Sequence, residues 1–248
     1  MRDLINKKAF HICMIIVIIA AILFIVGILI LKYSVEGEKN LPFNLNKIVI
    51  VSNVEGIDKE NAENKWAMDI NQNNDIYLYI EKNEHYNETE IIDKITLDNF
   101  VVNKKSEIGT AKIYKPNINE TAIFKNSTEN ETQTIEYIGD LESNIKETKI
   151  SNQGGLVVFR YSLEEIGEYI SNEDEEINYG ELLKKINIKN GDLKLNVSFD
   201  ITIKLNSGKA FRATVTIDLP SENVVENGTT SQEVTDLNNI IFKRIENV

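Results

Sequence analysis

The sequence predicts an all-β fold: a β-sandwich-like extracytoplasmic domain with small helical additions, preceded by one transmembrane helix. Three observations predict it. Ile12 to Leu31 form an uncharged apolar run, residues 193 to 205 alternate strictly between apolar and polar, and several shorter β-branched runs are separated by polar turns. We expect a cytosolic tail at 1–11, a transmembrane helix at 12–32, a linker at 33–46, a β-rich domain at 47–220, and a polar stretch with a C-terminal amphipathic helix at 221–248.

The apolar run is long enough to cross a membrane. A helix rises about 1.5 Å per residue, so twenty residues span about 30 Å, the thickness of the hydrocarbon core. Arg2, Lys7 and Lys8 precede the run, and few cations follow it. The positive-inside rule therefore places the N-terminus in the cytosol and the rest of the chain outside the plasma membrane.

A cleaved signal peptide is the alternative to a retained signal-anchor. The run is longer than the usual apolar region of a signal peptide, which is about 7–15 residues. No A-x-A cleavage site follows it, and Val35-Glu36-Gly37 is the nearest weak candidate. Whether the helix is cleaved stays open.

The charge balance argues against nucleic acid as a partner. The chain has a formal net charge of −12, and the first 32 residues contribute +3, which leaves −15 for the remainder. Phosphate backbones repel such a domain. The one cysteine, Cys13, lies in the apolar run, so the outer domain has no disulfide. No sequence motif indicates a cofactor.

The first half of the outer region reads as short strands joined by polar segments. Asn71 to Asp75 (N-Q-N-N-D) indicates a turn, and Asn117 to Thr132 indicates a long loop. Glu164 to Ile170 is ambiguous, because Ser162 and Glu165 fit a helical capping box but Gly167 weakens a helix. Gly180 to Ile186 reads as one or two helical turns. Strands are expected at 47–52, 75–81, 94–103, 111–115, 134–138 and 156–163.

The clearest local signal is a hairpin between Asp192 and Leu219. Apolar residues occupy the odd positions of both arms, so odd residues must face odd residues across the pair. We expect Leu205 opposite Phe211, which leaves Ser207-Gly208-Lys209 as a loop of odd length with Gly208 in the middle, where it supplies backbone freedom. Pro220 lacks an N–H and should end the second strand.

The last element is expected to be a helix from Ser231 to Glu246. Thr230 and Glu233 fit a capping box, and Val234, Leu237, Ile241 and Ile245 fall at helical spacing. The apolar stripe either packs on the domain or docks a partner.

The chain offers little for catalysis. His85 is the one histidine beyond the apolar run, and no G-x-S-x-G elbow accompanies it. Acidic pairs are too frequent to single out a glycosidase site. A weak metal candidate, for Ca²⁺, is the acidic run Glu173, Asp174, Glu175 and Glu176, although its spacing does not match an EF-hand. A solvated acidic loop is its ordinary interpretation.

A whole-chain resemblance concerns location alone. Beyond the basic start and the apolar run, it rests on four segments: Leu41-Pro-Phe, Asn71-Gln-Asn-Asn-Asp-Ile-Tyr, Ile150-Ser-Asn-Gln-Gly-Gly and Asp218-Leu-Pro. With these, the chain resembles uncharacterised single-pass membrane proteins of low-GC Gram-positive bacteria. The resemblance implies a bacterial plasma membrane and no activity.

The leading interpretation is a non-enzymatic envelope protein whose outer domain binds a protein partner or serves a structural role. The alternatives are a sensor module for a small ligand or Ca²⁺, and a surface hydrolase. The sequence does not identify the partner, the ligand or the oligomeric state.

Overall fold

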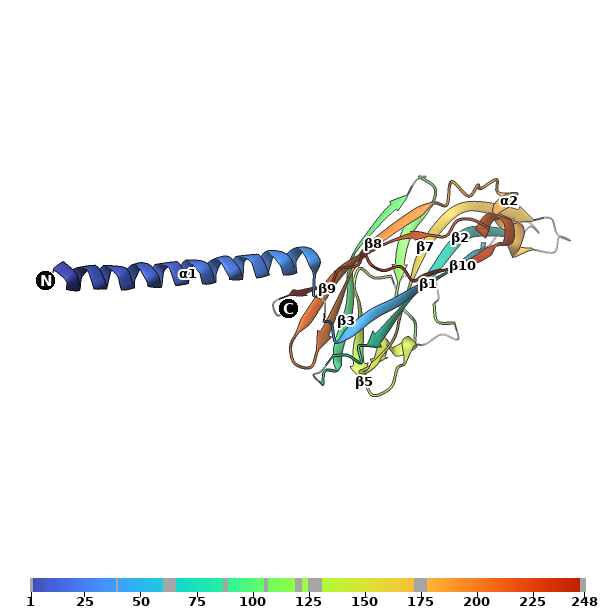
Figure 1. The fold of residues 1–248 in the computed structure, drawn as a ribbon. Helices are drawn as coiled ribbons and strands as arrows, with labels where there is room; N and C mark the ends of the chain where they lie inside the picture. Colours follow the sequence, from blue (N-terminus) through green and yellow to red (C-terminus); the bar gives the residue numbers. More distant parts are fainter. Residues whose placement is uncertain are drawn as a thin grey trace.

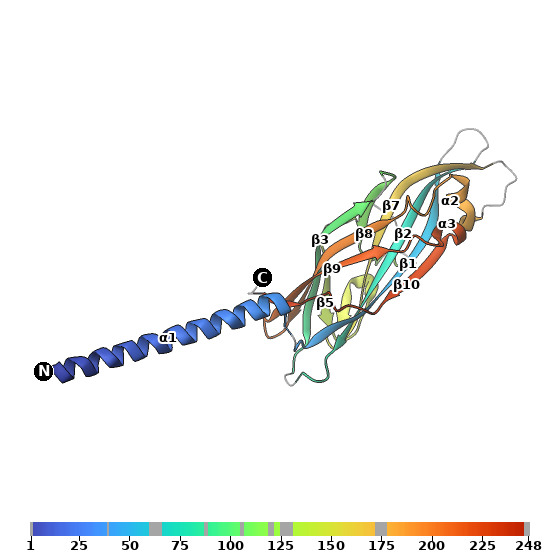
Figure 2. The same cartoon turned by 45° about the horizontal axis from the view of Figure 1, so that its top comes forward.

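The computed structural model describes residues 2–38, 40–59, 66–86, 89–104, 107–118, 122–124, 131–171 and 178–245. For residues 2–10, 12–13, 31–36, 66 and 104 it describes the backbone alone. A long N-terminal helix leads into an elongated body of two β-sheets (Figures 1 and 2).

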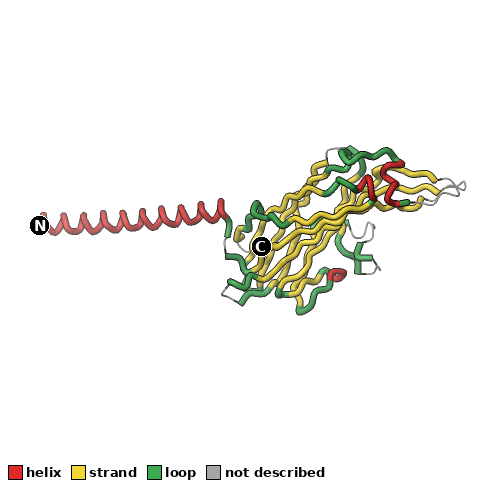
Figure 3. Tube along the Cα trace, turned by 45° about the vertical axis from the view of Figure 1, so that its right-hand side comes forward, coloured by secondary structure: helices red, strands yellow, loops and turns green. Residues whose placement is uncertain are grey.

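The helix α1 (Arg2–Glu36) extends beyond the predicted span at both ends and projects away from the sheets (Figure 3). Its large apolar side chains between Met14 and Ile30 are 44% to 70% exposed. Within the described part of the chain, no helix combines the length and the hydropathy that a bilayer crossing requires.

The chain leaves α1 through a tight turn at Gly37, where φ is +75°. A Cβ there would lie 2.8 Å from the carbonyl oxygen of Phe242, so only glycine allows this close approach. The Glu38 N–H donates to the same carbonyl at 2.9 Å. The C-terminal segment therefore lies against the junction between α1 and the sheets.

Two sheets, called A and B here, form the body. Sheet A has the strand order β10-β1-β2-β7-β4, and sheet B has the order β11-β9-β8-β3-β5-β6. All neighbouring strands are antiparallel except β5 and β6. The bounds in sheet A are β1 (Phe43–Lys59), β2 (Trp66–Lys82), β4 (Thr110–Tyr114), β7 (Gly154–Ser171) and β10 (Thr229–Val234). Those in sheet B are β3 (Ile92–Lys104), β5 (Ile135–Asp140), β6 (Lys149–Ser151), β8 (Leu195–Leu205), β9 (Ala210–Leu219) and β11 (Lys243–Ile245).

The sheets pack face to face around one apolar core, which confirms the β-rich prediction. Side chains at alternate positions of both sheets are buried, as the strand period of two requires. The ring of Phe159 in β7 meets the ring of Phe199 in β8 edge-on, with centroids 5.1 Å apart. Short helices η2 (Ile145–Glu147), η3 (Tyr179–Glu181), α2 (Leu182–Lys185) and α3 (Val224–Asn227) are the helical additions.

The hairpin of β8 and β9 confirms that odd residues lie opposite odd residues, but its register differs from the predicted one. The predicted pairing of Leu205 with Phe211 is wrong by two residues, because Phe211 lies opposite Ile203. The loop is 206–208, and Gly208 is its last residue with φ +84°. A left-handed third residue is typical of three-residue hairpin loops, whereas the sequence interpretation had Gly208 in the middle. Pro220 follows the end of β9, as predicted.

The predicted C-terminal helix, Ser231 to Glu246, is wrong. Thr229–Val234 form β10 on the edge of β1, and Lys243–Ile245 form β11 on the edge of β9. Backbone N–H and C=O groups of each of these strands form hydrogen bonds with the neighbouring strand of the sheet. The Thr-rich start of β10 also favours a strand over a helix. Leu237 still packs against the core, but from the irregular segment between the two strands.

The predicted turn at Asn71 to Asp75 is also wrong, because these residues lie inside β2. Asn and Asp favour turns when their side chains bond to local backbone, but here they bond to neighbouring strands. The ambiguous segment Glu164 to Ile170 belongs to β7. It contains a bulge in which the three residues Glu164–Ile166 lie opposite Asn71, and Glu165 has φ +56°.

Candidate functional site

β10 is the outermost strand of sheet A, so one of its edges faces away from β1. The Val54 N–H of β1 donates to the Gly228 carbonyl at 2.8 Å, just before β10. Hydrogen-bonded pairs alternate along an antiparallel ladder. The N–H and C=O of Thr229, Ser231 and Glu233 therefore point to the free edge. Among the described residues, these groups have no backbone partner.

β10 also lacks the features that usually protect a sheet edge. Lysine, arginine and proline discourage the pairing of an edge with another chain. Each of the other three edge strands carries such a cation: Lys112 in β4, Lys149 in β6, and Lys243 with Arg244 in β11. β10 reads Thr-Thr-Ser-Gln-Glu-Val, with one charge and no proline. It is therefore the edge strand whose sequence least opposes pairing.

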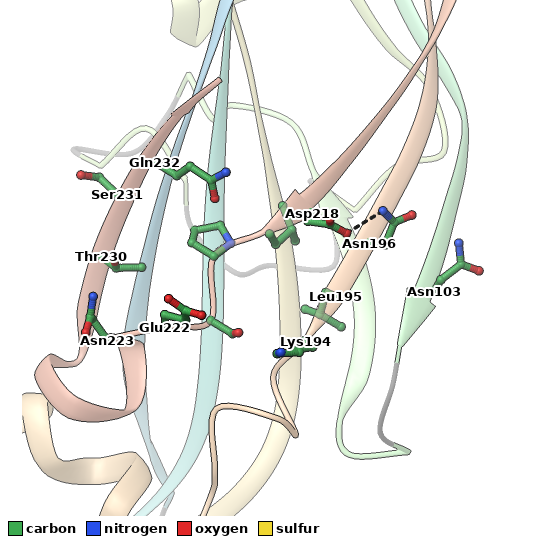
Figure 4. A pocket seen from close by; sticks show the side chains of 13 residues that line it. Asn103, Lys194, Leu195, Asn196, Asp218, Glu222, Asn223, Thr230, Ser231 and Gln232 are labelled. Carbon is green, nitrogen blue, oxygen red and sulfur yellow. Dashed lines mark hydrogen bonds between the residues drawn. The ribbon is translucent and has the colours of Figure 1, made fainter. Parts of the chain in front are cut away.

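A hollow of about 550 Å³ lies beside β10 (Figure 4). We call it the β10 hollow. It lies between β10, the end of β9, the start of β8 and the end of β3. Its lining consists of Asn103, Lys194, Leu195, Asn196, Asp218, Leu219, Pro220, Ser221, Glu222, Asn223, Thr230, Ser231 and Gln232.

The segment between β9 and β10 shapes one wall of the hollow. Pro220 ends β9, and the chain then crosses from sheet B to sheet A through α3. Asn223 and Gly228 flank α3 with φ of +66° and +71°, so the chain turns sharply at both ends. Val224 and Val225 are buried and fix α3 to the core. The wall is thus held by backbone geometry and apolar packing.

Amides, hydroxyls and three charged side chains dominate the lining. The charged residues are Lys194, Asp218 and Glu222, which give the hollow a net negative charge. The Asn196 side-chain amide donates to Asp218 Oδ1 at 2.9 Å. The lining contains no histidine, cysteine or aromatic residue, so it has no aromatic stacking platform for a sugar. It can offer hydrogen bonds and carboxylate oxygens to a polar or cationic group.

The polar part of β2 is a second unusual feature. Asn71, Gln72, Asn73 and Asn74 are at most 2% exposed. The Ser52 hydroxyl donates to the Asn74 side-chain oxygen. Asn74 Nδ2 in turn donates to the backbone carbonyl of β7, which it reaches at 3.4 Å. The side-chain amide of Gln72 has no hydrogen-bond partner among the described residues.

The face of sheet A that points away from the core holds an ion network formed by side chains of β1, β2 and β7. Arg160 donates to both oxygens of Asp75, with Nε–Oδ1 at 2.6 Å and Nη2–Oδ2 at 3.1 Å. The ring of Phe124 lies 4.9 Å from the guanidinium carbon. Asn73 Nδ2 donates to Glu55 at 2.5 Å. Because Arg160 and Asp75 are mostly enclosed and bonded to each other, this pair stabilises the sheet.

Two buried tyrosines differ in whether their hydroxyl groups have hydrogen-bond partners. The Tyr137 hydroxyl donates to the Val158 carbonyl at 2.9 Å and accepts from the Val158 N–H at 3.1 Å. The Tyr161 hydroxyl has no partner among the described residues. Burial raises the pKa of both phenols above the ordinary value of 10.0. Both hydroxyls therefore remain protonated at neutral pH.

The residues singled out in the sequence do not form a site. His85 is exposed in the turn after β2, where its backbone N–H donates to Asn83 Oδ1 at 3.0 Å. The acidic run Glu173, Asp174, Glu175 and Glu176 lies outside the described residues. Within the part that is described, no group of three His, Cys, Asp or Glu side chains could hold a metal ion.

Sequence reasoning missed the β10 edge because its residues were assigned to the C-terminal helix. The available signal was the Thr-Thr-Ser-Gln run of β-compatible polar residues without lysine or proline. The Gly228 turn before it also separates it from the preceding helical turn.

Comparisons with known proteins place the chain in no group. No protein-family model matches it, and no similar protein was found among curated sequences or solved structures.

Proposed function

We propose that this chain is a single-pass plasma-membrane protein whose extracytoplasmic β-domain binds a protein partner along the free edge of β10. The observation that carries the proposal is the unprotected edge itself. Thr229, Ser231 and Glu233 direct backbone donors and acceptors outward beside the β10 hollow. Addition of a strand to such an edge is a common mode of peptide recognition, in which backbone bonds give affinity and adjoining pockets give specificity.

The membrane part of the proposal rests on the sequence. The uncharged run from Ile12 to Leu31 extends at both ends beyond the side chains that the structure describes. The apolar side chains of α1 that are described face outward and pack against no sheet. Such a surface is costly in water and favourable in a lipid bilayer.

Membrane anchoring is tested by extraction and protease protection of the full chain. We expect it to stay with membranes in alkaline carbonate, and protease added outside the cell to cleave the β-domain. A matched variant that lacks residues 2–32 should be released. Release of the full chain by carbonate, or protection of the domain, would contradict the proposal.

Binding at β10 is tested by a photo-cross-linker placed on the edge of the protein in its native membranes. The Thr229→Cys variant, in a Cys13→Ser background, carries a benzophenone maleimide at the free edge. We expect one specific adduct. Adding Ser231→Pro should abolish it, because proline removes an outward N–H and blocks an added strand.

Two controls make the result specific to backbone pairing. Ser231→Ala keeps the N–H and should leave the adduct unchanged. A probe at the exposed Thr214 of β9, introduced by Thr214→Cys, should give no such adduct. Ser231 bonds outward and not to β1, so both Ser231 variants should melt at similar temperatures. An adduct that survives Ser231→Pro would contradict the edge as the binding site.

A small polar ligand in the β10 hollow is the second candidate function. The volume of about 550 Å³ falls within the range of small-molecule sites, about 300–1,000 Å³. The two candidates respond differently to a substitution at the edge. Glu233→Pro removes an outward N–H outside the lining of the hollow, so it should weaken an added strand and leave the binding of a small ligand unchanged.

A further inference from the structure

We infer that the segment paired with β10 belongs to a different protein, runs antiparallel to β10, and presents lysine or arginine side chains to the β10 hollow. This inference rests on the proposed function and names the chemistry of the partner. It follows from the direction of β10 relative to α1, the alternation of side chains along its edge and the charge of the hollow, together with the greater stability of antiparallel ladders.

The direction of β10 argues against a second copy in the same membrane. β1 starts shortly after α1 and runs away from it, and β10 is antiparallel to β1, so β10 runs back toward the α1 end (Figures 1 and 2). In a symmetric dimer joined through β10, the two β10 strands would pair antiparallel, because the two-fold axis would be perpendicular to them. Their α1 helices would then leave in opposite directions. In two copies anchored in the same membrane, however, both α1 helices must leave their domains in the same direction, toward that membrane.

The alternation of side chains determines which residues of the partner enter the hollow. Thr230 and Gln232 pair with Ser52 and Ile50, which are buried core-facing residues of β1. Even positions of β10 therefore face sheet B, where the hollow lies. Every second side chain of an added strand faces the same way. An antiparallel strand is preferred because its ladder is slightly more stable per residue than a parallel one.

The charge of the hollow selects a basic side chain. Asp218 and Glu222 outnumber Lys194 in the lining. Asp218 accepts one hydrogen bond from Asn196, and a carboxylate has further acceptor positions for an ammonium or guanidinium group. The sequence beyond residue 32 carries a net charge of −15, so its field also attracts basic segments and repels acidic ones.

Two synthetic peptides test the chemistry with the detergent-solubilised full chain. One is Thr-Lys-Val-Lys-Val-Lys-Thr, and the other has glutamate at each lysine position. At low salt we expect the lysine peptide to bind about tenfold more tightly or better. N-methylation of alternate backbone amides in the lysine peptide should abolish binding. Glu222→Gln should reduce the difference between the two peptides, whereas Glu142→Gln, at an exposed position of the β5–β6 connection, should not.

Peptide direction and partner identity are read by cross-linking. A lysine peptide with a C-terminal cysteine should form a disulfide with Thr229→Cys faster than one with an N-terminal cysteine, since antiparallel pairing brings its C-terminus to residue 229. Equal or reversed rates would overturn the direction. In a Cys13→Ser background, oxidation of Ser231→Cys in membranes should yield no disulfide-linked homodimer, and such a homodimer would overturn the assignment to a different protein.

The two proposals fail separately. Equal affinities for both peptides, or no binding of either, would overturn the basic partner. An edge adduct that is lost with Ser231→Pro in native membranes would still support the proposed function.

Discussion

β2 is buried along most of its length, but one half buries apolar side chains and the other half buries amides. In one half, Ile76, Leu78 and Ile80 face the core and are at most 1% exposed. In the other half, Asn71 to Asn74 are equally enclosed although all four side chains are amides. The apolar half lies opposite a regular stretch of β7, whereas the polar half lies at the bulge of Glu164–Ile166.

The difference indicates what the buried amides do. A bulge removes ladder bonds and leaves backbone groups without partners. Asn71 Oδ1 accepts from the Glu165 N–H at 2.9 Å, in the middle of the bulge. Asn74 Nδ2 donates to the Tyr161 carbonyl, in the regular ladder next to the bulge. The Asn71 side chain thus supplies an acceptor to a backbone N–H of the bulge, and an apolar side chain could not do so.

Removing packing from the apolar half should have the greatest effect. Leu78→Ala deletes a fully buried side chain, so we expect the free energy of unfolding to fall by about 3 kcal/mol. Urea unfolding of the solubilised full chain, followed by circular dichroism, measures it. Ile138→Ala, at a half-exposed site on β5, is the aliphatic control and should cost under about 1 kcal/mol. Equal losses would show that the apolar half is not the tightly packed part.

Breaking the ion network beside the polar half should have an intermediate effect. Asp75→Asn leaves the Arg160 charge, whose side chain is 10% exposed, without its main partner. We expect a loss of about 2 kcal/mol by the same measurement. Asp140→Asn removes the carboxylate of a surface pair with Lys149, whose side chains are 43% and 40% exposed, and should cost much less than Asp75→Asn. A larger loss at Asp140 than at Asp75 would refute this ranking.

Replacing an unsatisfied amide should have the smallest effect and the opposite sign. Gln72→Leu removes a buried amide without a described partner, so we expect the free energy of unfolding to rise by about 1 kcal/mol. Asn74→Leu should lower it, because the Ser52 hydroxyl would lose its acceptor. Loss of stability in Gln72→Leu would mean that its amide is hydrogen bonded in solution.

Local patterns predicted the strands well where burial follows a simple period. The alternation from 193 to 205 predicted β8, and the parity rule predicted that odd residues of the hairpin face each other. The pattern could not distinguish two registers that differ by two residues, because both keep the same faces buried. The position of Gly208 in the loop decided between them.

The polar elements could not be read from the sequence because their partners are distant along the chain. Asn71 to Asp75 has the composition of a turn, and only the bulge in β7, about 90 residues later, explains why it lies in a strand. Likewise, Val234, Leu237 and Ile241 have helical spacing, but Val234 pairs with β1, and Leu237 and Ile241 lie in the segment between β10 and β11. The Thr-Thr-Ser-Gln run favours a strand, but only the pairing with β1 shows that this strand is the edge of a sheet.

The strand that follows α1 has a mechanical consequence. β1 begins at Phe43, close to the end of α1, and its partners β2 and β10 lie on either side. A pull transmitted through α1 acts along β1 and loads the ladders on both sides in shear. Many hydrogen bonds then resist together, instead of opening one after another as in unzipping. Under such a pull, separating β1 from its neighbours should therefore need more force than opening the same ladders one bond at a time.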